Sequence, residues 1–220
     1  MRNTTEVTGM VIRVMPVGER DRRVTILSME QGKLSFFARG AGKPGNPFMG
    51  ATRPFSYGRF VLFQGRDSFS LESVEITNYF EEVAADVETT CFGMYFLELT
   101  DYFAREFAPE PGLLKLLYRS LLALTKPAIP RELTRRIFEL RALVLDGSYD
   151  PEPPGRNAEL CRYTWHYICT APQEKLFTFT VSDEVLKELS ENADISLSRF
   201  VDRKLHSLEI LEMMTGESPA

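Results

Sequence analysis

The stretch from Val17 to Gly45, VGERDRRVTILSMEQGKLSFFARGAGKPG, constrains the fold of this chain more than any other. It contains two runs rich in β-branched, aromatic and other apolar residues, Arg23–Met29 and Lys33–Ala38, separated by a turn that ends at Gly32. Two such runs joined by a short turn with glycine predict a β-hairpin. Both strands adjoin arginines and glycines, which is typical of a binding surface rather than of a catalytic pocket.

Three further strands are expected in the first 80 residues, at Thr4–Val14, Tyr57–Gln64 and Ser68–Thr77. Gly9, inside the first of them, indicates a bulge or a sharp bend of the kind that small barrels need at their corners. Five short strands with no helical pattern between them predict a small closed barrel. An OB-fold is the leading candidate, and an SH3-like barrel is the alternative on strand count alone.

The pattern changes near residue 80, where apolar residues begin to recur three and four positions apart, as they do in helices. Helical segments are expected at 83–107, 112–124, 131–145, 158–170, 182–190 and 196–214. The predicted fold class is therefore α+β. An N-terminal five-stranded OB-fold barrel at 1–80 is followed by an all-helical C-terminal domain at 81–220, which a Pro/Gly loop at 146–156 interrupts.

Charge is distributed unevenly along the chain, although its formal net value is only −5. Residues 1–80 carry 11 Lys or Arg and 7 Asp or Glu, whereas residues 81–220 carry 15 and 24. A basic first part joined to an acidic remainder predicts two modules with different partners, and chance variation on a solvated surface is the alternative.

Three features predict a cytoplasmic protein without a membrane segment. No stretch approaches the roughly 20 consecutive apolar residues of a membrane helix. The N-terminal sequence MRNTTEVTG lacks the apolar segment of a signal peptide. The chain has only three cysteines, which form no paired framework and are expected to stay reduced.

Motifs for catalysis and for metal binding are incomplete. The GAGK sequence ending at Lys43 lacks two elements of a phosphate-binding loop, because Phe37 and Pro44 occupy the positions of its first glycine and its Ser/Thr. Cys161 and Cys169 would lie two turns apart on a helix, too far to share a tetrahedral ion, and His166 alone adds no site. We therefore expect no enzymatic activity, no metal and no cofactor.

Cations and aromatic residues are mixed throughout residues 1–80, a combination that suits single-stranded nucleic acid. Cations neutralise phosphates, and aromatic faces stack on bases for roughly 1–3 kcal/mol each. Most of the phenylalanines are expected to fill the barrel, so the cations carry the hypothesis. Gly40, Gly42 and Gly45 would let a loop backbone approach a phosphate. The predicted DNA-binding residues are Arg20, Arg22, Arg23, Lys33, Arg39, Lys43, Arg53 and Arg59; Arg13 and Arg66 are further cations of this part of the chain.

Several short motifs, in this order, resemble the RecO family of bacterial recombination mediator proteins, over nearly the whole chain. They are Gly18–Arg22 leading into Val24–Ser28, then Gln31–Ser35, Ala38–Ala41, Leu176-Phe177 and Leu205–Leu211. The resemblance implies an N-terminal OB-fold and a helical C-terminal domain. It also implies that the protein binds single-stranded DNA, anneals complementary strands, and works with RecR, and often RecF, to load RecA recombinase onto DNA coated by single-strand-binding protein.

Many members of that family carry a four-cysteine zinc module after the third long helix of the second domain. The corresponding stretch here, Asp146–Arg156, contains no cysteine, so we expect this Pro-rich loop to take the place of the module.

The resemblance further implies that the helical domain binds the acidic, apolar C-terminal tail of single-strand-binding protein. Such a tail needs a groove with apolar walls and one or two cations. The arginines of segment 131–145 are expected to point outward and to supply those cations, and a solvated helix face is the alternative. They are Arg131, Arg135, Arg136 and Arg141.

Three functions are thus open from the sequence. The first is a non-enzymatic DNA repair and recombination mediator. The second is an OB-fold adaptor that binds proteins without contacting DNA directly. The third is a nuclease or phosphotransferase with an unrecognised site.

Overall fold

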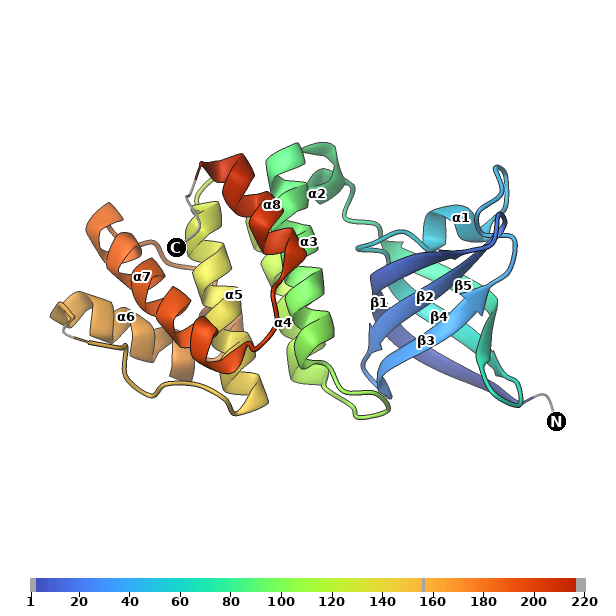
Figure 1. The fold of residues 1–220 in the computed structure, drawn as a ribbon, viewed down its shortest axis with the longest axis horizontal. Coiled ribbons are helices and arrows are strands. Elements are labelled where there is room, and N and C mark those ends of the chain that lie inside the picture. The colour runs from blue at the N-terminus through green and yellow to red at the C-terminus, as the bar shows by residue number, and fades with distance from the viewer. Residues whose placement is uncertain (1–2, 156, 217–220) are drawn as a thin grey trace. The chain divides into compact units, whose positions relative to one another are not determined.

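A computed structural model describes residues 3–155 and 157–216 of the chain. It divides into two compact units (Figure 1). The first, which we call the barrel unit, comprises Met1–Glu81 and Leu97–Leu114. The second, the helical unit, comprises Glu82–Phe96 and Lys115–Ala220.

Five strands close into a barrel in the order β1-β2-β3-β5-β4, as predicted. All neighbouring pairs are antiparallel except β3 and β5, which are parallel. A five-stranded closed barrel with this order is an OB-fold, so the SH3-like alternative is wrong. The strands are β1 (Thr4–Val17), β2 (Asp21–Ser28), β3 (Gly32–Ala38), β4 (Tyr57–Gln64) and β5 (Phe69–Asn78).

The long strand β1 closes the barrel because it pairs with two neighbours, β4 along its first half and β2 along its second. Gly9 takes part in both pairings, and a Cβ there would lie only 2.5 Å from the Leu27 carbonyl oxygen. Its lack of a side chain therefore permits the close crossing of strands. The register shift itself lies between Val11 and Arg13, slightly later than Gly9 suggested.

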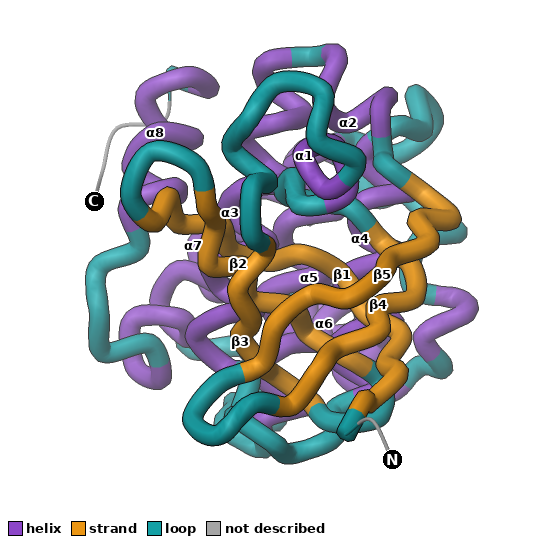
Figure 2. Tube along the Cα trace, turned by 90° about the vertical axis from the view of Figure 1, so that its right-hand side faces the viewer, coloured by secondary structure: helices purple, strands orange, loops and turns teal. Residues whose placement is uncertain are grey.

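Alternating apolar residues of the strands fill the barrel, with Val24, Ile26 and Phe36 almost fully buried. A short helix that the sequence pattern did not reveal, α1 (Phe48–Ala51), lies at one end of the barrel (Figures 1 and 2). Phe48 from this helix packs against the barrel core. Four residues are too few to show a helical period, which explains why α1 was not predicted.

The barrel unit includes a second segment of chain that runs beside β3. The Lys33 amide donates to the Arg105 carbonyl at 3.0 Å, and the Phe107 amide donates to the Lys33 carbonyl at 3.2 Å. Gly32 has a φ of +66°, and a Cβ there would overlap the Ala108 carbonyl oxygen at 1.8 Å. The turn glycine is thus required both by its backbone conformation and by this close approach.

The single helix expected at 83–107 is wrong, because two helices cover this stretch only as far as Phe103 and the residues after them pair with Lys33 of β3. Helices nevertheless make up most of the rest of the chain, as predicted. They are α2 (Glu81–Ala85), α3 (Val87–Phe103), α4 (Pro111–Leu124), α5 (Arg131–Asp146), α6 (Glu159–Thr170), the short 3₁₀ helix η1 (Gln173–Lys175), α7 (Asp183–Phe200) and α8 (His206–Thr215). The predicted break after Ser190 is wrong, because α7 is continuous. Leu189, Ala193 and Leu197 keep one buried face across the polar residues that suggested a loop.

Helix α5 forms the centre of the helical unit, with α6 and α7 packed against it (Figure 1). Every residue from Leu133 to Leu143 is buried. Phe138 stacks on Phe96 of α3 with ring centroids 4.3 Å apart. A helix buried on all sides has no outward face, so most of its arginines are buried as well.

The loop that follows α5 is held in place by hydrogen bonds from α6 and α7. The Trp165 indole donates to the Asp150 carbonyl at 3.0 Å, and the Ser196 hydroxyl donates to the Asp150 carboxylate at 2.5 Å. Asn192 donates to the side-chain oxygen of Asn157 at 2.6 Å. The predicted loop at 146–156 is therefore a fixed connection within the helical unit; position 156 lies outside the described residues.

Candidate nucleic-acid interface

Three of the eight predicted DNA-binding cations already have partners inside the barrel unit. Arg22 lies on the inward register of β2 and donates to the Met49 carbonyl at 2.9 Å and to the Thr52 hydroxyl at 3.0 Å. These bonds join β2 to α1. Arg22 therefore has a structural role, and its contact with DNA stays a prediction.

Lys33 and Arg59 are paired with acids. The Lys33 ammonium donates to the Asp101 carbonyl at 2.7 Å and to its carboxylate at 3.2 Å. Arg59 lies between Glu6 at 3.3 Å and Glu75 at 3.0 Å, and its hydrogen bond with Glu6 raises the pKa of the guanidinium. A phosphate would have to compete with these carboxylates for either cation.

The other five predicted cations are exposed. Within the described part of the chain, their side chains have neither a hydrogen bond nor an ion pair. They are Arg20, Arg23, Arg39, Lys43 and Arg53. Exposed cations without internal partners are the groups that can neutralise an external polyanion.

Hydrogen bonds between two loops bring three of these cations together; we call Arg20, Arg39 and Lys43 the loop cations. The Gly42 amide donates to the Arg20 carbonyl at 2.8 Å, which joins the loop after β1 to the loop after β3. The Gly40 amide donates to the Asp21 carboxylate at 2.7 Å. The fold thus places three positive side chains around one junction.

The glycines of this junction serve the loops themselves. The amides of Gly40, Gly42 and Lys43 all donate within the protein, so they are not available to a phosphate. A Cβ on Gly42 would lie 3.2 Å from the Arg20 backbone, a tight contact that favours glycine there. The interpretation of Gly40 and Gly42 as a backbone cradle for phosphate is therefore wrong, and the loop offers side chains instead.

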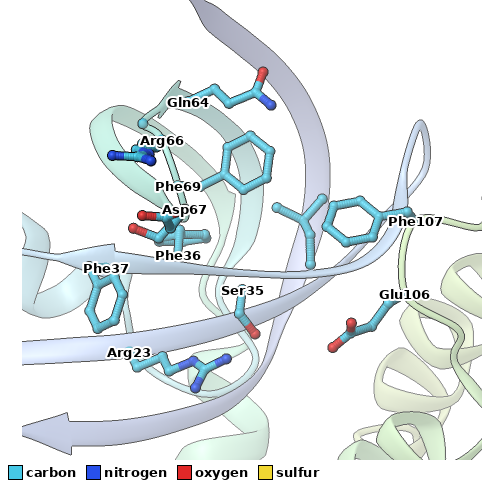
Figure 3. A pocket seen from close by; sticks show the side chains of 13 residues that line it. Arg23, Ser35, Phe36, Phe37, Gln64, Arg66, Asp67, Phe69, Glu106 and Phe107 are labelled. Atoms are coloured by element: carbon cyan, nitrogen blue, oxygen red, sulfur yellow. The ribbon is translucent and has the colours of Figure 1, made fainter.

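A hollow of about 370 Å³ lies beside β3 (Figure 3), and we call it the aromatic hollow. One wall comes from β2 and β3, a second from the loop between β4 and β5, and a third from the segment after α3. In an OB-fold, the face of the second and third strands and the loop between the fourth and fifth are the usual ligand surface. The hollow is lined by Arg23, Leu34, Ser35, Phe36, Phe37, Gln64, Gly65, Arg66, Asp67, Ser68, Phe69, Glu106 and Phe107.

Arg23 connects the aromatic hollow to the loop cations. It is opposite Phe37 in the β2–β3 register, and the next pair is Arg22 with Ala38, immediately before Arg39. Cations and aromatic rings therefore follow one another from the loop junction along β2 and β3. Single-stranded nucleic acid is held by this combination, because cations contact its phosphates and aromatic rings stack on its bases.

Several residues of the aromatic hollow were not among the predicted site residues. Phe107 has 63% of its surface exposed, and its ring lies 6.5 Å from that of Phe69. Glu106 and Phe107 follow the predicted barrel by more than 20 residues, so only their long-range pairing with β3 reveals them. Arg66, in contrast, is recognisable from the sequence as a binding residue, because it is a cation in a turn that contains glycine.

The arginines of α5 correct the expectation of an outward-facing cationic groove. Arg135 and Arg136 are almost completely buried, with exposed fractions of 1% and 2%. Both donate to the buried Glu139 carboxylate, at 2.9 and 3.0 Å, and the Tyr95 hydroxyl donates to it at 2.7 Å. Burial alone would raise the pKa of Glu139, but the two guanidinium groups outweigh burial and lower it.

The remaining two arginines of α5 are also engaged. Arg141 is buried and donates to the carbonyls of Ile168 at 3.3 Å and Cys169 at 2.5 Å, near the end of α6. Burial lowers the pKa of Arg141. Arg131 is half-exposed and pairs with Asp86 at 3.0 Å and with Glu88 at 2.5 Å. The prediction that Arg135, Arg136 and Arg141 point outward is therefore wrong.

The described residues contain neither a cluster suited to a metal ion nor a helix suited to a membrane. No group of three or more His, Cys, Asp or Glu side chains there is arranged to hold a metal ion. None of the described helices combines the length and the apolar character needed to cross a membrane.

The fold and the pattern of cations together place the protein in the class of OB-fold proteins that expose a basic and aromatic face. Two family models identify its family. "Recombination protein O N terminal" matches residues 1–80, and "Recombination protein O C terminal" matches residues 84–149. The chain belongs to the RecO family of DNA repair proteins.

Curated relatives support this assignment, and each is named DNA repair protein RecO. The one from Acetivibrio thermocellus is 24% identical over 245 residues, which cover 96% of this chain and 98% of the relative. The one from Desulforudis audaxviator is 36% identical over 149 residues, covering 67% and 58%. The one from Symbiobacterium thermophilum is 36% identical over 141 residues, covering 64% and 56%. In these last two alignments the chain spans little more than half of the relative.

Proposed function

We propose that this chain is a non-enzymatic mediator of recombinational DNA repair that binds single-stranded DNA through its barrel unit. The observation that carries the proposal is the division of the barrel cations. Arg22, Lys33 and Arg59 are engaged by partners inside the barrel unit, whereas the loop cations and Arg23 are exposed and have no partner among the described residues.

Binding would follow from the sequence of charges and rings along the barrel. The loop cations neutralise phosphates and release counterions, which favours binding at low salt. Phe37 and Phe107 offer aromatic surfaces to neighbouring bases. A strand held mainly by its phosphates keeps most of its bases open to pairing, and this is the basis on which we propose strand annealing.

Family membership extends the proposal to partners. We propose that the protein works with RecR, and with RecF where it is present, to load recombinase onto DNA coated by single-strand-binding protein. This activity would take place in the cytoplasm, at the bacterial nucleoid. For the tail of single-strand-binding protein, the surface to test lies in the helical unit, where Leu124, Lys126, Ile129 and Arg131 line a cleft of about 470 Å³. Glu82 and Asp86 also line this cleft and would oppose an acidic tail.

The alternative is a protein-binding adaptor, and one observation favours it. Asp67 and Glu106 line the aromatic hollow, and both would repel a phosphate placed there. If the hollow bound DNA only through its phosphates, these two acids would weaken binding.

Fluorescence anisotropy with a labelled single-stranded oligonucleotide tests the proposal. We expect the logarithm of the binding constant to fall linearly with the logarithm of salt concentration, with a slope of about −0.7 for each phosphate contacted. An annealing assay with complementary oligonucleotides should show faster duplex formation at low salt. Absence of salt-dependent binding by the full chain would contradict DNA binding and leave the adaptor function as the better account.

A further inference from the structure

Phe107 is displayed at the edge of the aromatic hollow by an unfavourable backbone conformation. Its φ is +56°, in the left-handed region that bulky L-residues rarely adopt. The bond from its amide to the Lys33 carbonyl fixes it there, at 3.2 Å. The ring nevertheless stays largely exposed, and its centroid lies 6.5 Å from that of Phe69. Strain that holds an exposed aromatic ring beside a hollow points to a ligand for that ring.

The charges of the aromatic hollow are balanced but unpaired. Arg23 and Arg66 supply two guanidinium groups, and Asp67 and Glu106 supply two carboxylates. Within the described residues, none of these four side chains has an ion pair or a hydrogen bond. Figure 3 shows Arg23 and Glu106 coming from opposite walls, with Ser35 between them.

This combination selects the chemistry of a ligand. A simple anion would be repelled by Asp67 and Glu106, and a simple cation would be repelled by Arg23 and Arg66. A flat molecule whose edge carries both donors and acceptors satisfies all of these groups and can stack on Phe107. Nucleobases have this form.

We propose that the aromatic hollow binds one unpaired nucleobase of a DNA strand and prefers a base with an exocyclic amino group, so that cytosine binds better than thymine. This inference rests on the proposed single-strand binding. The base stacks on Phe107, its amino group donates to the Asp67 or Glu106 carboxylate, and its ring acceptors receive a hydrogen bond from Arg23 or Arg66.

Thymine fits the same groups less well. At the position of the cytosine amino group it presents the O4 oxygen, which is an acceptor. A carboxylate facing that oxygen gains no hydrogen bond and is left desolvated, which disfavours binding. The loop cations contact only phosphates, so they bind both bases equally and do not mask the preference.

The test compares oligo-dC with oligo-dT of equal length, at equal salt and mildly alkaline pH, where cytosine stays unprotonated. The two strands carry the same charge and the same ring size. We expect the full chain to bind oligo-dC about tenfold more tightly, a difference in the usual range for one well-read base edge. The double variant Asp67→Asn with Glu106→Gln should lose most of this preference, mainly through stronger binding of oligo-dT.

Two further variants separate base reading from charge and from stacking. Glu19→Gln removes an exposed carboxylate of the barrel unit outside the aromatic hollow, and it should strengthen binding of both oligonucleotides equally. Phe107→Ala should weaken both by about fivefold or more, whereas Phe107→Trp should preserve both.

Equal binding of oligo-dC and oligo-dT by the full chain would overturn the inference while leaving single-strand binding intact. The same holds if the preference persists in the double variant. Failure of both oligonucleotides to bind in a salt-dependent way would overturn the proposed function together with this inference, so the two failures are distinguishable.

Discussion

The arginines of the barrel loops and those of α5 are the same residue type in opposite situations. The loop cations are exposed and have no partner among the described residues, whereas Arg135 and Arg136 are buried against Glu139. The difference is visible locally. In α5, acids stand three and four positions from the arginines, the spacing at which helix side chains meet. Arginine density therefore indicates a binding surface only where no acid lies within reach.

Removing the acid from the buried cluster should give the largest change in stability. Glu139→Gln removes the one fully buried carboxylate of the cluster, so the two guanidinium groups are left with the more exposed Glu132 and Asp194 as acidic partners. Breaking a buried ion pair in this way costs about 3–5 kcal/mol. Urea unfolding should show this loss, while the folded fraction still binds DNA. The control, Glu75→Gln, removes an exposed partner of Arg59 and should leave the free energy of unfolding nearly unchanged, because water screens that pair. Similar results for the two variants would contradict the contrast between the regions.

Acid should act on the same cluster. The folded-state pKa of Glu139 lies below its unfolded value of 4.5, so its contribution to stability is fully present above about pH 4.5. That contribution is lost as the pH falls through the folded pKa. Asp194 opposes this trend, because burial raises its pKa. When the pH is lowered from about 4.5, we expect the thermal midpoint of the wild type to decrease, and that of Glu139→Gln to decrease less steeply. Parallel plots of midpoint against pH for the two proteins would exclude Glu139 as the cause.

Two neighbouring arginines of the barrel should have opposite effects. Arg22→Ala removes two hydrogen bonds between β2 and α1 and should cost about 1–3 kcal/mol of stability with little loss of DNA binding. Arg20→Ala removes an exposed cation and should weaken DNA binding with little loss of stability. Urea unfolding and anisotropy on both variants measure the four effects, and a DNA-binding loss in Arg22→Ala as large as in Arg20→Ala would assign Arg22 to the interface.

A chelator should have the smallest effect of all. The loop at 146–156 is fixed by hydrogen bonds to Asp150 from Trp165 and Ser196, so we expect no change in the thermal midpoint on treatment with EDTA. Elemental analysis of the purified protein provides the second measurement. About one zinc per chain, with a lower midpoint after its removal, would contradict this prediction.

Sequence predicted most of the fold because its signals are local. Alternation and a turn glycine mark the hairpin of β2 and β3, and periodic apolar residues mark the helices. The position of Glu106 and Phe107 beside β3 could not be predicted in this way, because it depends on pairing between residues about 70 positions apart. The burial of Arg135 could not be predicted either. A helix surrounded by others buries even the face that its sequence marks as polar.

The salt dependence of single-strand binding tests most directly whether the unpaired cations form the interface. Two triple variants lose the same charge: Arg20, Arg39 and Lys43→Ala at unpaired positions, and Arg13, Arg59 and Arg131→Ala at paired ones. At about 0.7 per phosphate contact, the first variant should reduce the magnitude of the salt slope by about 2, and the second should leave the slope close to that of the wild type. Equal slopes in the two variants would contradict the account.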